Sequence, residues 1–358
     1  MIHYALRDGL KYCLQCRQEG SNLGNAEKAR PDTKEFPEKD FDWVEQYYRF
    51  EEYMNKNWHP NVNLGAAIRG GGLLTDHGGK HVQSVIAHAR DILTDSMQLT
   101  GYEIYLLLVS IHFHDVGNIQ GREQHEEKIA EIIDLMGEIL PLDTAEKNFV
   151  TSIATAHGGY LNGDKDTIRD INTDTLYDGV QIRCRLLAAI LRFADEISDD
   201  SSRADFSGIV IPRENEAYHF YSKALDPVSV TGETMKYHFR VPYDMTQKKI
   251  GKGKDYIYLY DEILERIAKC MRELEYCKKY SCGMIQITTM DVTIDFLKKG
   301  SSFRPKESNS FRLTLHGYPD KVHSSIKDYL DDSKNLRGTS SALRFMNGAE
   351  VCDAMKLE

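Results

Sequence analysis

The chain has 358 residues, more than one typical domain, so its length predicts one large unit or two unequal ones. Hydrophobic residues make up 41% and charged residues 28%, as in a globular protein with a real core. The 55 acidic residues outnumber the 45 basic ones, and the formal net charge of −10 disfavours a protein whose main task is to coat nucleic acid.

The cysteines and the N-terminus favour a reducing compartment. Seven cysteines occur, an odd number, and the N-terminus MIHYALRDGL carries charges where a signal peptide would be apolar. We therefore expect a cytoplasmic protein with reduced thiols. Cys13 and Cys16 have CxxC spacing but no second pair close by, so a zinc site is not predicted there. The longest nearly apolar run, 104–113, is too short to span a membrane, and no membrane contact is expected.

Residues 1–79 form the first part of the predicted organisation. Apolar residues at helical spacing predict a helical extension over 1–60, with one helix before residue 15 and another at 42–58. A glycine-rich loop follows at 61–79, with six glycines between 65 and 79. It lacks the lysine and the spacing of a P-loop, so we do not interpret it as a nucleotide cradle.

Residues 61–205, which include that loop, are predicted to form the main helical domain. Capping boxes at Thr100–Glu103 and Asp143–Glu146 mark two of the helix starts. Asp178 is taken as the start of the last helix. The predicted helices cover residues 81–97, 100–116, 124–140, 143–157 and 178–197.

After residue 206 short β-like runs replace the helical pattern. They lie at 208–211, 228–231, 237–241, 284–296 and 311–315, and predicted helices lie at 256–279 and 321–330. Residues 206–332 are therefore predicted to be an α+β accessory region. Residues 333–358 show no clear periodicity and are expected to be a loosely held tail. The fold class is mainly α: a helical bundle core followed by a smaller α+β region.

Histidines and aspartates recur at the ends of the five predicted helices. Antiparallel helices bring the end of one close to the start of the next, so these side chains should gather inside the bundle. A buried polar cluster of this kind requires a metal or a full set of hydrogen bonds. Taken singly, a helix-terminal histidine is more often a cap or a surface group, and only the ordered set favours a site. The set is His81, His114, Asp115, His125, His157 and Asp195.

The order H…HD…H…H…D resembles the HD superfamily of metal-dependent phosphohydrolases. The segment IHFHDVGN is similar to the family's apolar-HD-x-G segment, and LLAAILRFADEI to its closing helix, within a resemblance that covers residues 75–205. The resemblance implies that His81, His114, Asp115 and Asp195 form the minimal metal set, with Asp115 bridging two ions. It also implies that His125 and His157 are the extra histidines of the two-metal branch, which includes cyclic-nucleotide and cyclic-dinucleotide phosphodiesterases and the HD nuclease of CRISPR systems.

One position departs from the family pattern. Many relatives have lysine where this chain has Asn118, giving HDxGK, so whatever that lysine contributes is in doubt here. A GYP-like second signature is also missing from the sequence. Both differences argue against the cyclic-dinucleotide class.

The residue types predict a particular chemistry. Imidazole and carboxylate ligands suit divalent Mn, Fe, Zn or Ni, with Mg a weaker candidate, and two ions are expected. Arg122 and Arg192 are the predicted phosphate contacts, although salt bridges to nearby carboxylates would explain them equally well. Lys80 and Arg203 are weaker candidates. His77 is interpreted as a loop residue with a smaller chance of joining the site, and His112 as structural.

Three functions remain open at this level. The first is a phosphohydrolase, either a phosphodiesterase or a nucleotidase, acting on a nucleotide or a similar small phosphoester. The second is an HD-type nuclease on single-stranded nucleic acid, which the acidic balance and the lack of a lysine/arginine run disfavour. The third is a ligand-sensing HD protein of a bacterial signalling or conflict system. A partner protein or a second copy of the chain is expected to bind, if at all, through 206–332.

Overall fold

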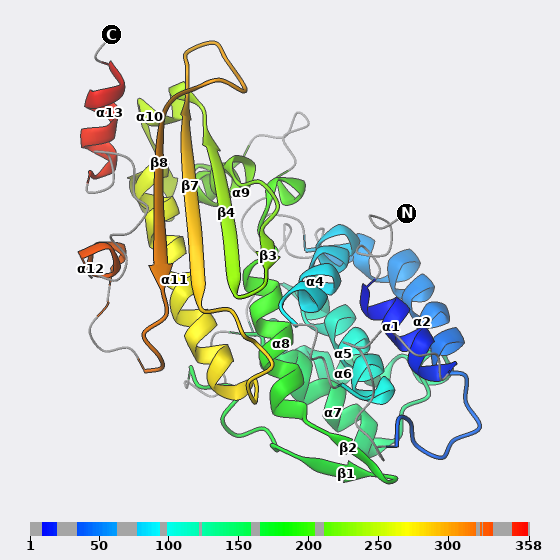
Figure 1. Cartoon of the computed structure of the whole chain (residues 1–358). Coiled ribbons are helices and arrows are strands. Elements are labelled where there is room, and N and C mark those ends of the chain that lie inside the picture. Colours follow the sequence, from blue (N-terminus) through cyan, green and yellow to red (C-terminus); the bar gives the residue numbers. More distant parts are fainter. Residues whose placement is uncertain are drawn as a thin grey trace. The chain divides into compact units, whose positions relative to one another are not determined.

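The computed structural model describes residues 9–19, 34–62, 77–93, 99–121, 124–158, 165–204, 211–319, 323, 325–331 and 346–356. The chain divides into two units, each with its own internal contacts. The first unit comprises Met1–Gly71, His77–Asp195 and Cys277–Gln286, and the second comprises Gly72–Asp76, Glu196–Tyr276 and Ile287–Glu358. Helices dominate the first unit, whereas the longest strands lie in the second (Figure 1), so the predicted fold class is confirmed.

The first unit is built around α5 (Gly101–Phe113), all of whose residues are buried. Its sequence GYEIYLLLVSIHF is apolar on every side, and a helix of that kind must be covered on every side. Four helices provide the cover: α1 (Gly9–Gln18), α2 (Trp43–Asn57), α4 (Gly79–Asp91) and α7 (Thr144–Thr155). The next two residues after α5 are His114 and Asp115, so the polar pair lies at the end of the most buried helix.

Both predicted capping boxes are confirmed, at Thr100–Glu103 for α5 and at Asp143–Glu146 for α7. The continuous helix predicted for 124–140 is wrong. It is divided into η2 (His125–Lys128), a short 3₁₀ helix, α6 (Ile129–Asp134) and η3 (Gly137–Ile139). Gln124 and Gly137 both have positive φ, which a continuous right-handed helix does not allow.

The helix predicted to begin at Asp178 begins later. Residues before it form a hairpin of β1 (Thr175–Tyr177) and β2 (Val180–Ile182), and α8 runs from Cys184 to Glu196. Asp178 and Gly179 have φ of 48° and 80°, the pair of positive values that a two-residue type I′ turn requires. The Asp-Gly dipeptide was therefore a hairpin signal rather than a helix cap.

Glu103 joins the starts of α5 and α8. Its carboxylate accepts from the backbone N–H of Arg183 at 3.0 Å and from the Arg183 guanidinium at 2.7 and 2.5 Å, besides its capping bond to Thr100. Both side chains are buried, at 0% and 6% exposure. Since α5 leads into His114 and Asp115 and α8 carries Asp195, this ion pair fixes the two helices that supply three of the predicted ligands.

Glu103→Ala should strongly lower the free energy of unfolding, by about 3–5 kcal/mol, because it leaves the Arg183 guanidinium buried without its carboxylate. Urea denaturation measures the effect. The double variant Glu103→Ala/Arg183→Met is the matched control and should recover much of the loss, because it removes the orphaned charge. A loss of less than about 1 kcal/mol in the single variant, as for an exposed pair, would contradict this role.

The second unit contains a four-stranded sheet in the order β3 (Ser229–Thr231), β4 (Thr234–Val241), β7 (Thr289–Leu297), β8 (Pro305–Thr314). The central pair β4–β7 is parallel and the outer pairs are antiparallel. Alternate residues of β4 are buried, and Tyr237 reaches Cys270 of α11 (Leu259–Tyr280), which lies along one face of the sheet (Figure 1). The remaining elements are α9 (Glu216–Ala224), α10 (Tyr243–Thr246), β5 (Lys249–Lys252), β6 (Asp255–Tyr258), α12 (Ile326–Asp331) and α13 (Gly348–Lys356).

Several predictions for this region need correction. The tail expected to be loosely held contains α13, a regular helix with Val351, Cys352 and Met355 buried, so a short apolar stripe was overlooked. The β5–β6 hairpin was not predicted. Of the run at 208–211 only Ile211 is described, and it is not in a strand. Most of the glycine-rich loop (63–76) lies outside the described residues. No helix in the described part of the chain is long and apolar enough to cross a membrane.

Candidate metal centre

The six side chains singled out in the sequence lie together in the first unit. They come from five places in the chain: α4, the end of α5, η2, the residue pair after α7, and α8. His81 and His114 are fully buried, and Asp115 is 7% exposed. The donor atoms fall into two groups of three, His81–His114–Asp195 and Asp115–His125–His157, and within each group all lie within 4.8 Å of one another.

The first group has the spacing of ligands around one ion. His81 Nε2 lies 3.2 Å from His114 Nε2 and 3.0 Å from Asp195 Oδ1, and His114 Nε2 lies 3.6 Å from the same carboxylate oxygen. Ligands that bind one ion at about 2.1 Å are separated by about 3.0–3.4 Å in octahedral or tetrahedral arrangements. The group therefore needs little rearrangement to hold a cation.

The second group has nearly the same dimensions. Asp115 Oδ1 lies 3.3 Å from His125 Nε2 and 3.6 Å from His157 Nε2, and the two imidazole nitrogens are 3.3 Å apart. In each group, three donor atoms from three separate places in the chain lie close together. Both match the spacing expected for one ion each.

Asp115 joins the two groups through its two oxygens. Oδ1 faces His125 and His157, whereas Oδ2 lies 3.4 Å from His114 Nε2 and 3.7 Å from His81 Nε2. A carboxylate in this position presents one oxygen to each group of imidazoles. That is the geometry by which a carboxylate can bridge two cations.

Hydrogen bonds outside the cluster orient its members. His114 Nδ1 donates to the carbonyl of Ile111 at 2.7 Å, and His157 Nδ1 donates to that of Ala154 at 2.6 Å. The Nε2 lone pairs of both rings are then directed at the cluster, as metal ligation requires. Asn118, at the position of the family's lysine, donates to Asp115 Oδ1 at 3.0 Å, so it helps to fix the shared carboxylate.

The electrostatics of the cluster call for positive charge. Burial lowers the pKa of His114, but the carboxylates of Asp115 and Asp195 outweigh it and raise that pKa to about 10. Burial alone would raise the pKa of Asp115, yet His77 and His114 hold it well below its usual range. Without a cation, a proton on His114 helps to balance the buried carboxylates. A divalent cation would provide the same balance and leave that imidazole neutral.

His77 and His112, which were not among the six predicted ligands, have defined positions. His77 Nδ1 lies 2.7 Å from Asp115 Oδ2, so this residue contacts the shared carboxylate, and together with His81 and Asp115 it forms a further potential metal-binding group. Its four-residue spacing from His81 was the available signal. His112 contacts Tyr47 and His59 in the core, in line with its predicted structural role.

Of the two predicted phosphate contacts, only Arg192 lies within the described residues. Arg122 lies outside the described residues. Arg192 is 7% exposed and donates to Thr167 Oγ1 at 2.8 Å and to the carbonyl of Gly158 at 3.3 Å, so it supports the backbone beside His157. Lys80 is exposed, and Arg203 lies 3.9 Å from Asp199.

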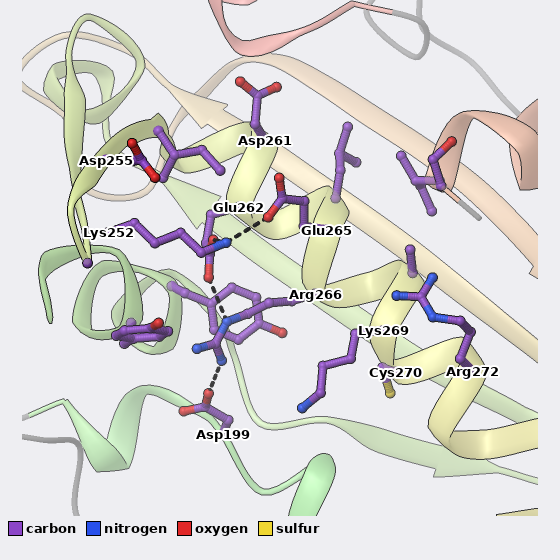
Figure 2. A pocket seen from close by; sticks show the side chains of 18 of the residues that line it. Asp199, Lys252, Asp255, Asp261, Glu262, Glu265, Arg266, Lys269, Cys270 and Arg272 are labelled. Carbon is purple, nitrogen blue, oxygen red and sulfur yellow. Dashed lines mark hydrogen bonds and ion pairs between the residues drawn. The ribbon is translucent and has the colours of Figure 1, made fainter. Parts of the chain in front are cut away.

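A cavity of about 1390 Å³ lies elsewhere, within the second unit, and none of the six predicted ligands lines it. Figure 2 shows Arg266 between Asp199 and Glu262, and Lys252 beside Glu262. The positive and negative side chains that line the cavity therefore largely neutralise one another. The donor atoms with metal-ligand spacing, in contrast, all belong to the first unit.

Gly117 is the residue that lets His125 approach the end of α5. A Cβ at position 117 would lie 1.9 Å from the carbonyl oxygen of His125, which no real contact permits.

Gly117→Ala should therefore displace His125 and reduce bound divalent metal from two equivalents towards one, measured by elemental analysis after dialysis. The matched control is Gly79→Ala, where a Cβ would lie 3.3 Å from Asn55 Oδ1 and 3.9 Å from His59 Cβ. Equal metal content in wild type and Gly117→Ala would contradict the assignment.

The chain matches the model of a known protein family. The model of the HD-CE family matches residues 71–269, more than half of the chain. No curated protein and no solved structure matches. The matched region includes all six predicted ligands and continues into α11.

Proposed function

The chain belongs to the HD-CE family, and on that basis we propose that it is a metal-dependent phosphohydrolase with a two-metal centre. The observation that carries the proposal is the pair of donor groups joined by Asp115. Two sites that share one carboxylate can hold two ions close enough together for two-metal hydrolysis.

The donor set fits divalent transition metals. Four imidazoles and two carboxylates suit Mn, Fe, Zn or Ni, with Mg a weaker candidate because it prefers oxygen ligands. Two such ions supply a nucleophile from water at neutral pH and offset the negative charge of a phosphoryl group.

The predicted ligands are assigned to the two ions as follows. His81, His114 and Asp195 would hold the first ion, and His125 and His157 the second. Asp115, oriented by Asn118 and His77, would be shared between them. Three or four protein donors per ion would leave room for water and substrate. Arg122 and Arg192 remain the proposed phosphate contacts, and Arg192 also steadies the segment that bears His157.

The proposed substrate is a nucleotide or a related small phosphoester. A formal net charge of −10 disfavours long polyanions as substrates of the metal centre, whereas a small phosphoester needs only the local positive charge of that centre. A complete donor set argues against a protein that only senses a ligand, because such a protein does not need every metal donor.

The first prediction here concerns metal stoichiometry. Wild-type protein should bind two equivalents, and His125→Ala or His157→Ala should bind about one, because each removes a donor of the second ion only. Asp115→Ala should lose both ions and all phosphohydrolase activity. His238→Ala, a histidine of the second unit, is the matched control and should retain two. A single equivalent in wild type, unchanged in His125→Ala, would leave only the four-residue site.

The second concerns the substrate. Phosphate-release assays on nucleotides, cyclic nucleotides and small phosphodiesters should show turnover that exceeds cleavage of a single-stranded oligonucleotide. Asp115→Ala serves as the inactive control for contaminating phosphatases. Efficient degradation of single-stranded DNA without turnover of small phosphoesters would instead establish the nuclease alternative.

A further inference from the structure

The β7–β8 connection has a charge opposite to that of the protein as a whole. Residues 298–306, here called the basic hairpin end, read KKGSSFRPK, with four cations and no carboxylate, in a chain of net charge −10. Figure 1 shows this connection as a loop beyond the end of the sheet. Within the described part of the chain, no carboxylate forms an ion pair with Lys298, Lys299 or Arg304. Lys299 lies 6.0 Å from the centre of the Tyr243 ring, but no described carboxylate neutralises any of the three charges.

An aromatic ring stands among these cations. Phe303 is 81% exposed, more than any other large hydrophobic residue described in the chain. Lys298, Lys299 and Arg304 beside it are exposed as well. Single exposed apolar side chains are common on protein surfaces, and this one is distinguished by the cations around it. Covering such a ring with a partner would stabilise the complex.

The loop is folded so that it presents this ring outward. Ser301 Oγ accepts from the backbone N–H groups of Phe303 and Arg304 at 3.3 and 3.0 Å, and Ser301 N–H donates to the carbonyl of Lys298 at 3.0 Å. Gly300 has φ of 72°, which permits the reversal. Phe303 is thus exposed by an ordered turn. Because the backbone of this turn is already ordered, it should lose little conformational entropy when a partner binds.

Two alternative partners fit less well. A strand of another protein would pair along β8, which begins at Pro305, so it would not account for the exposed ring and the cations that precede that strand. A membrane surface would require a broad apolar face, and the basic hairpin end exposes a single ring. Unstacked bases joined by phosphates match both features, because one ring stacks on one base while neighbouring cations contact the backbone.

We propose that the basic hairpin end is a docking surface for single-stranded nucleic acid. Phe303 stacks on a base, and Lys298, Lys299 and Arg304 contact the flanking phosphates. This binding is independent of the metal centre and of the proposed hydrolysis. It brings the protein to a nucleic acid rather than defining what the metal centre cleaves.

Fluorescence anisotropy with a labelled short oligothymidylate, in EDTA and with the full-length protein, tests the proposal. Three phosphate contacts predict a slope of log K against log salt of about −2, because each contact to a single strand contributes about −0.7. Phe303→Ala should weaken binding about tenfold with that slope unchanged. Lys298→Ala/Lys299→Ala should make the slope shallower by about 1.4. A duplex of the same length should bind more weakly than the single strand.

Matched controls and a local probe make the outcome decisive. Leu135→Ala removes another exposed apolar side chain, and Lys56→Ala/Lys327→Ala removes two other exposed cations; neither should alter binding. Phe303→Trp should retain binding, and its added tryptophan emission should be quenched by the oligonucleotide. No binding, or binding that none of the hairpin variants changes, would overturn the proposal. Phe303-dependent binding to anionic vesicles without oligonucleotide binding would overturn it in favour of a membrane surface.

Discussion

The carboxylate of Asp115 is the constraint on which the first unit depends. It is 7% exposed, and its two oxygens face imidazoles of separate chain segments, with His81 and His114 on one side and His125 and His157 on the other. A buried carboxylate is costly unless positive charge compensates it. The surrounding histidines are therefore held close to a charge that a protonated imidazole or a bound cation must balance.

The architecture around Asp115 follows from that requirement. α5 is apolar on all sides, so it is buried throughout its length, and the polar pair that follows it emerges inside the bundle rather than at the surface. The Glu103–Arg183 ion pair aligns its start with that of α8, which brings Asp195 to the same place. Gly117 allows the backbone of His125 to pass directly against the end of α5. The packing of α5, the Glu103–Arg183 ion pair and the absence of a side chain at Gly117 thus all help to place the predicted ligands around Asp115.

Local signals of the sequence predicted much of this. The two capping boxes, the buried apolar helix and the order of the ligands were all visible, and the structure brings the six side chains together. The breaks at Gln124 and Gly137 and the hairpin at Asp178–Gly179 were not predicted, because helical spacing of apolar residues outweighed single residues that needed positive φ. The contact of Asn118 with Asp115 could not be predicted, since it depends on how the chain turns after α5. The domain boundaries stay a prediction, although the family match extends well past residue 205.

Anomalous diffraction from crystals of the protein loaded with manganese tests the central claim most directly. We expect two peaks about 3.5–4 Å apart, one beside each oxygen of the Asp115 carboxylate. One peak should be ligated by His81, His114 and Asp195, and the other by His125 and His157. A single peak, or peaks that Asp115 does not bridge, would contradict the two-metal centre.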